Sequence, residues 1–99
     1  MKVLKFQFEE KEGFLSVIEK PDFYYALVQK DTPKVSAAKD THRLHISYEL
    51  KKPVYKQVVV NVSYDPDVIK SVYDQLEAEK NLYFKQLDDT LCVLMIEKE

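Results

Sequence analysis

The sequence predicts a mainly β domain (α+β) in which six antiparallel strands close a small barrel. A short helix follows the third strand, and a longer helix precedes the last. Three observations support this: six segments rich in β-branched and aromatic residues, short turns between most of them, and two segments with helix-start signals. Residues 91–96 are apolar on both faces, as in a central strand. The 99 residues are expected to form one domain, residues 1–99.

The first three strands are predicted from their apolar patterns. Residues 3–8 alternate apolar and polar, and residues 14–18 follow a charged turn, residues 9–13, that ends in the only glycine. A helix over 14–18 is the alternative, because a short apolar run has no decisive period. A Pro-Asp pair then separates this hairpin from the aromatic third strand, residues 23–29.

A short helix is expected next, capped by Asp31 or Thr32 and running to about Lys39. Pro33 fits its first turn, where a missing N–H group costs nothing. Residues 43–50 and 54–64 are predicted strands joined by a Lys-Lys-Pro turn.

The second helix has the clearest start in the sequence. Asp65 can cap it, Pro66 fits its first position, and Asp67 places an acid against the positive helix end. Its apolar residues form one stripe, consistent with packing on the barrel. These residues are Val68, Ile69, Val72, Tyr73 and Leu76.

Composition excludes several classes of protein. The single cysteine, Cys92, lies in an apolar strand, so we expect a buried thiol, no internal disulfide and a reducing, cytoplasmic location. No apolar run approaches the roughly 20 residues of a transmembrane helix, so no membrane association is expected. The alternating N-terminal segment does not have the pattern of a signal peptide.

The charge pattern favours a small anionic ligand. Residues 30–56 contain seven basic and three acidic side chains, a balance of +4, whereas the rest carries eight basic and fourteen acidic ones, a balance of −6. A mildly basic centre fits one bound anion better than nucleic acid, which requires a sustained basic surface. The alternative is a solvated face without a ligand. The strand, short capped helix and strand of residues 23–50 form a plausible phosphate cradle.

These segments resemble the pyridoxamine 5'-phosphate oxidase-like family, the FMN-binding split β-barrels. The motifs concerned are the strand 23–28, the helix start Thr32-Pro33-Lys34-Val35 and the turn and strand 40–49. The strand 54–64 and the helix start Asp65-Pro66-Asp67 follow in the family's order. The resemblance covers nearly the whole chain and implies a split β-barrel that forms a homodimer.

The resemblance also implies FMN bound at the subunit interface and a possible small-molecule oxidoreductase activity. By position, Thr32 and Lys34 would hold the FMN phosphate, and Lys39 and Arg43 are further candidates for the same anion. A flavin would supply redox chemistry while the protein positions it. Whether the chain is an enzyme stays open at this stage.

Three departures from the family pattern leave other hypotheses open. No helix precedes the first strand, residues 14–18 contain no arginine, and Val28-Gln29 stands where a Ser/Thr-Gly pair often occurs. A cofactor-free homodimeric split barrel, acting as a binding module without catalytic activity, is therefore the second hypothesis. A structural α+β domain unrelated to the family is the third.

The remaining candidates are aromatic or potential metal ligands. Tyr48 and Tyr55 could stack on a flavin ring, although tyrosines on strands more often complete a core or an interface. His42 and His45 are predicted on opposite faces of a strand, and no third ligand has recognisable spacing, so no metal site is expected. No serine or cysteine has a context for nucleophilic catalysis.

Overall fold

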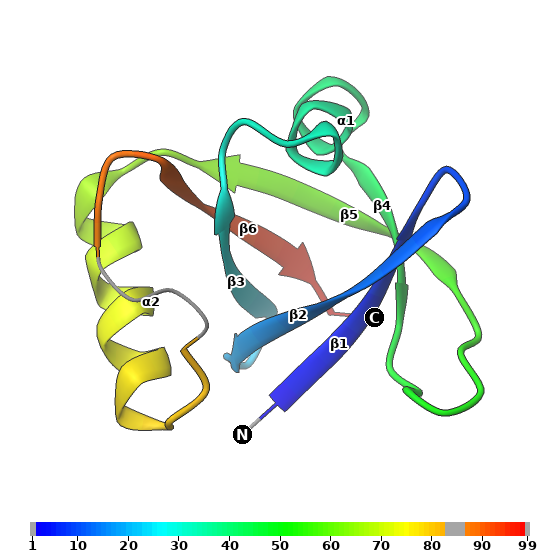
Figure 1. The fold of residues 1–99 in the computed structure, drawn as a ribbon, viewed down its shortest axis with the longest axis horizontal. Coiled ribbons are helices and arrows are strands. Elements are labelled where there is room, and N and C mark those ends of the chain that lie inside the picture. The colour runs from blue at the N-terminus through cyan, green and yellow to red at the C-terminus, as the bar shows by residue number, and fades with distance from the viewer. Residues whose placement is uncertain (1, 83–86, 99) are drawn as a thin grey trace.

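This computed structural model describes residues 2–82 and 87–98. Within them, six strands and two helices follow one another in the predicted order (Figure 1). In chain order they are β1 (Lys2–Phe8), β2 (Lys11–Glu19), β3 (Phe23–Gln29), α1 (Pro33–Thr41), β4 (Arg43–Ser47), β5 (Lys56–Ser63), α2 (Pro66–Ala78) and β6 (Leu91–Glu97).

The strands form a closed antiparallel barrel in the order β1-β2-β3-β6-β5-β4. It closes because β1 pairs with β4, with Phe6 opposite Ile46. β6 lies between β3 and β5, and Cys92, Val93 and Leu94 along it are fully buried. The predictions of a central last strand and of a buried cysteine are both confirmed.

Apolar residues pack on both sides of the barrel wall. The interior is filled by side chains of every strand together with Val35 and Ala38 of α1. A second cluster lies outside, where α2 packs against β2, β3 and β6 (Figure 1). Its members include Ile18 and Leu27 from the strands and Leu76 from the helix. Each side of β3 therefore faces packed side chains.

The two helices differ in how they begin. The N–H group of Asp67 donates to the Asp65 carboxylate at 2.9 Å, so the predicted cap of α2 is confirmed. Thr32 has the extended backbone of an N-cap, but its side chain makes no capping hydrogen bond. Neither helix in the described residues is long and apolar enough to cross a membrane.

The first hairpin corrects two predictions. Residues 14–18 belong to β2, so the alternative helix is wrong. The turn is also shorter than predicted, because β2 already begins at Lys11 and Glu9 adopts the positive φ of 56°. Gly13 therefore lies within β2, opposite Phe6. A Cβ atom at Gly13 would stand 2.5 Å from Cε1 of Phe6, so glycine leaves room for the ring.

The predicted strand 43–50 is too long at its C-terminal end. β4 ends at Ser47, whose hydroxyl accepts hydrogen bonds from the N–H groups of Glu49 and Val54. These bonds turn the chain away from β1 after Ser47. β5 correspondingly begins at Lys56 rather than at residue 54.

Candidate functional site

The pairing between β2 and β3 is interrupted halfway along the barrel. Only Val17 with Ala26, Ile18 with Tyr25, and Glu19 with Tyr24 pair between these strands. Beyond them, residues 11–16 of β2 remain paired with β1, and β3 remains paired with β6 along its whole length. Each strand follows its other neighbour, so the two separate towards the end of the barrel that α1 covers (Figure 1).

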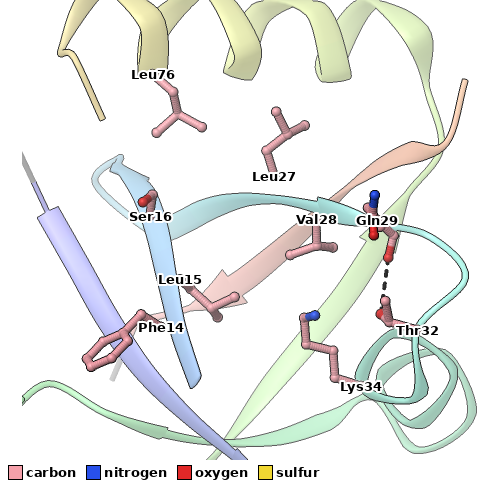
Figure 2. A pocket seen from close by; sticks show the side chains of 9 residues that line it. All are labelled: Phe14, Leu15, Ser16, Leu27, Val28, Gln29, Thr32, Lys34 and Leu76. Carbon is pink, nitrogen blue, oxygen red and sulfur yellow. Dashed lines mark hydrogen bonds between the residues drawn. The ribbon is translucent and has the colours of Figure 1, made fainter. Parts of the chain in front are cut away.

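A cavity of about 570 Å³ lies at this separation. Figure 2 shows its lining side chains, with Leu15, Val28 and Lys34 on the barrel side and Ser16, Leu27 and Leu76 on the side of α2. Phe14, Gln29 and Thr32 complete the lining. The walls are mainly apolar, with polar groups gathered near the start of α1.

Lys34 is the charged residue among those that line this cavity. Its side chain is half-buried, and burial lowers the pKa of its ammonium group, with the nearby Cys92 acting in the opposite direction. Among the described residues no carboxylate pairs with it, and its Nζ atom lies 5.2 Å from the centre of the Phe6 ring. In the described part of the chain, the ammonium group in this cavity thus has no carboxylate as a counter-charge.

Cys92 lies within electrostatic range of this ammonium group. Burial raises the pKa of its thiol to about 11, although the Lys34 charge lowers that pKa in part. The thiol is therefore protonated near neutral pH, and as a neutral group it does not offset the charge of Lys34.

The start of α1 offers fewer free donors than its position suggests. The N–H groups of Val35 and Ser36 both donate to the Thr32 carbonyl oxygen at 3.1 Å, and Pro33 has no N–H group. The Thr32 hydroxyl donates to the carbonyl oxygen of Gln29 at 3.1 Å. An anion here would depend mainly on the Lys34 ammonium group, with the Thr32 hydroxyl and Gln29 amide as polar neighbours.

The structure brings Thr32 and Lys34 together but places the other basic candidates elsewhere. Lys39 is exposed on α1, and its Nζ atom lies 5.7 Å from the centre of the Tyr64 ring. Arg43 is exposed at the start of β4, where its Nη1 atom donates to the carbonyl oxygen of His42. Neither residue lines the cavity.

The two candidate tyrosines also lie outside the cavity lining. The Tyr48 ring packs against the barrel core and against Tyr24, with 5.9 Å between the ring centres. The Tyr55 hydroxyl is buried beside Glu12, and burial, more than that carboxylate, raises its pKa. Both residues lie in the loop between β4 and β5, so the prediction that they stand on strands is wrong.

The sequence analysis did not identify the other half of the site. Residues 14–18 and Val28-Gln29 were noted only as departures from the family pattern, and none of them was named as a site residue. Their role depends on β2 and β3 ceasing to pair, and this separation has no local sequence signal. The structure leaves Phe14 with 64% of its surface accessible, which the sequence did not indicate.

The histidines do not form a metal site with their neighbours. His42 ends α1 in a left-handed conformation, whereas His45 lies on β4. No group of three or more His, Cys, Asp or Glu side chains with metal-binding geometry occurs in residues 2–82 and 87–98.

Comparison with solved structures relates this barrel to a known protein. A crystal structure of a "putative pyridoxamine 5'-phosphate oxidase" from Listeria innocua matches 95% of this chain and 79% of that chain, with a TM-score of 0.63 and 11% sequence identity. The likeness shows a shared fold. At this identity it supports the barrel architecture alone. No family model and no curated protein matches the sequence.

Proposed function

We propose that the chain is an FMN-binding split-barrel protein that holds the phosphate of FMN at Lys34. The observation behind this proposal is the half-buried ammonium group of Lys34. It points into a mainly apolar cavity, and no carboxylate of residues 2–82 and 87–98 pairs with it. A buried charge is costly unless it is paired, so this arrangement favours a ligand that supplies the missing anion. The related fold of the Listeria innocua protein makes FMN the first ligand to test.

The chemistry of the lining residues fits FMN. A cavity of about 570 Å³ falls within the roughly 300–1,000 Å³ typical of small-molecule sites. Leu15, Leu27 and Val28 provide apolar walls for a flat ring system, and Lys34 provides charge for the phosphate. Thr32 and Gln29 would add hydroxyl and amide contacts to the same end of the ligand.

Bound FMN would supply the redox chemistry of a small-molecule oxidoreductase. The contribution of the chain would be binding and orientation: Lys34 fixes the anionic end, and the apolar walls exclude water from the ring. Among the lining residues in the described part of the chain, Lys34 is the one acid or base, so we assign no proton-transfer step to another side chain.

We also propose a homodimer in which a second copy covers the open side of the cavity. Phe14 stands at this side with 64% of its surface accessible, and Lys5 places its Nζ atom 5.6 Å from the centre of the ring. Burying such an aromatic residue against a second copy would enclose the ligand. Sedimentation equilibrium of the wild type and of Phe14→Ser tests this. Loss of the dimer in the variant is expected, and a monomeric wild type would contradict the proposal.

A cofactor-free binding module is the alternative function. It is favoured by the start of α1, where the N–H groups of Val35 and Ser36 are already bonded to Thr32. A dianionic phosphate would then meet a single charged donor, whereas a singly charged small molecule would be adequately matched by Lys34 alone.

The decisive experiment is titration of the protein with FMN, followed by quenching of flavin fluorescence. We expect binding by the wild type and an affinity lower by more than about tenfold in Lys34→Glu, because a charge-assisted contact is replaced by repulsion. Lys39→Glu is the matched control: it makes the same charge change on the same helix outside the cavity, and it should bind within about twofold of the wild type.

Riboflavin, which lacks the phosphate, distinguishes the role of Lys34 from a general effect on the cavity. It should bind wild type and Lys34→Glu equally. If tens of micromolar FMN produce no signal with the wild type, the flavin proposal is wrong and the cofactor-free module becomes the better description.

A further inference from the structure

The amine of Lys34 is a potential nucleophile, because its neutral form carries a reactive lone pair. Its side chain extends from the first turn of α1 into the cavity, beside Val28 and Leu15 (Figure 2). Burial lowers the pKa of the ammonium group, so the neutral amine is more accessible here than on an exposed lysine. Loss of the proton is also a second way, besides binding an anion, to remove the cost of an unpaired buried charge.

The groups around the amine do little to hold it in the charged form. Among the described residues no carboxylate pairs with Lys34, and the nearby Cys92 thiol is protonated near neutral pH. The Phe6 ring, whose centre lies 5.2 Å from Nζ, attracts the ammonium group only weakly. The amine can therefore exchange its proton for a bond to a ligand without breaking an ion pair with the described part of the chain.

The rest of the cavity determines which electrophile such an amine would meet. Its walls are mainly apolar, and the side chains of Leu15, Leu27, Val28 and Leu76 supply most of them. A nitrogen bonded to the ligand cannot also reach an anionic group at the far end of that ligand. Since the described lining residues include no second cation, the electrophile must be uncharged and must carry an apolar body.

We propose that Lys34 captures a small uncharged aldehyde, with an aromatic body, as an imine. The lone pair of the neutral amine forms a bond to the carbonyl carbon, the carbonyl oxygen takes a proton from water, and the nitrogen releases one to water. The resulting carbinolamine then expels its hydroxyl group as water while the nitrogen lone pair forms the C=N bond. No oxidant or reductant is consumed, and water is the product released besides the imine.

The shape of the cavity suits an aromatic ring attached to this nitrogen. Figure 2 shows Leu15 and Val28 on the barrel side, next to Lys34, and Leu27 and Leu76 on the side of α2. A ring placed between these pairs would bury both of its faces against aliphatic side chains. Water for the proton exchanges would reach the nitrogen from the open side of the cavity.

Capture of an aldehyde goes beyond flavin binding and does not require a flavin. Both ligands would use Lys34, but in different protonation states: a phosphate pairs with the ammonium group, whereas imine formation uses the neutral amine. The two ligands therefore exclude each other from the cavity, so bound FMN should protect Lys34 from an aldehyde.

Reductive labelling of the unaltered protein tests the capture. Sodium cyanoborohydride converts an imine into a stable secondary amine, and peptide mass spectrometry then gives the labelling rate of each lysine. Benzaldehyde is compared with formaldehyde, which has no ring to bury, and exposed Lys39 on the same helix is the internal reference. The ratio of Lys34 to Lys39 labelling should be about tenfold higher with benzaldehyde, the effect of burying one aromatic ring. Equal ratios for the two aldehydes would overturn the inference.

A competitor without an electrophilic carbon tests whether the ring binds before it reacts. Benzyl alcohol in large excess should slow the benzaldehyde labelling of Lys34 severalfold and leave Lys39 unchanged. Labelling of Lys34 that benzyl alcohol does not slow would mean that no bound complex precedes the reaction, and the proposed site would be wrong. Lys34→Arg keeps the positive charge but forms no imine, so the fast-labelled species should be lost in the intact mass of this variant.

FMN added during labelling separates this inference from the flavin proposal. If FMN binds and protects Lys34 while the two aldehydes give equal ratios, aldehyde capture is wrong and the flavin site stands. If benzaldehyde labels Lys34 selectively and FMN does not slow it, the phosphate contact is wrong and aldehyde capture stands.

Discussion

The ammonium group of Lys34 lies 5.2 Å from the centre of the Phe6 ring, and that ring lies over Gly13. Lys34 of α1, Phe6 of β1 and Gly13 of β2 therefore lie next to one another in space. The ring gives the ammonium group a weak cation–π contact in place of a carboxylate. This contact does not neutralise the charge, so Lys34 remains available to an anionic ligand.

Lys34→Met should raise the free energy of unfolding at pH 7 while weakening FMN binding. Burial lowers the pKa of Lys34 below its ordinary 10.5, so the charged form is less favourable in the folded protein than in the unfolded chain. Methionine keeps the length of the side chain and removes the charge. Urea denaturation followed by circular dichroism measures the change.

The stability difference between Lys34→Met and wild type also depends on pH in a defined direction. Between the lowered pKa and 10.5, the unfolded wild-type chain binds more protons than the folded protein, so its stability rises with pH relative to the variant. The advantage of Lys34→Met should therefore be constant near neutral pH and shrink as pH rises towards 10.5. An advantage that grows with pH would contradict the buried-charge explanation.

Gly13→Ala should destabilise the fold by about 1–2 kcal/mol because the added methyl group forces the Phe6 ring to move. The expected cause is specific, since the new Cβ atom would stand 2.5 Å from Cε1 of that ring. A double-mutant cycle with Phe6→Leu provides the control. Without the ring, Gly13→Ala should be nearly neutral, and an equal cost in both backgrounds would show that the backbone, not the ring, is responsible.

The strands and helices of the barrel were predicted well because the signals that define them lie within short segments of the sequence. Strands such as residues 23–29 and 91–96 combine β-forming residues with clear boundaries, and Asp65-Pro66 fixes the start of α2. The errors fall where a contact distant in sequence sets the boundary. Gly13 resembled a turn residue, yet it is in β2 because of Phe6.

The candidate site could be predicted only in part for the same reason. Thr32 and Lys34 were named from the family resemblance, which rests on a helix-start motif of only a few residues, and both line the cavity. The opposite wall, with Phe14 and Ser16, exists because β2 stays with β1 while β3 stays with β6. This separation of β2 from β3 follows from the twist and packing of the whole barrel, so no short segment of the sequence predicts it.

Ser47→Ala should lower the free energy of unfolding by about 1 kcal/mol, the usual net contribution of an intramolecular hydrogen bond. The Ser47 hydroxyl is fully buried, accepts from the N–H groups of Glu49 at 3.1 Å and Val54 at 3.0 Å, and donates to the Glu49 carbonyl oxygen at 2.9 Å. Ser36→Ala, at an exposed helix position, is the control and should change stability by less than about 0.5 kcal/mol. Similar effects of the two substitutions would show that the loop does not depend on Ser47.

Removing the side chains of the two N-cap residues, Asp65 and Thr32, should have unequal effects on stability. Asp65→Ala should cost about 1 kcal/mol, the usual value for a side chain that bonds a helix N–H group. Its carboxylate accepts from Asp67 at 2.9 Å, whereas the Thr32 hydroxyl donates away from its helix to Gln29. Thr32→Ala should therefore cost clearly less in urea denaturation. An equal loss would mean that the Thr32 hydroxyl leaves Gln29 and caps α1 in solution, which would also free the Gln29 carbonyl oxygen towards the cavity.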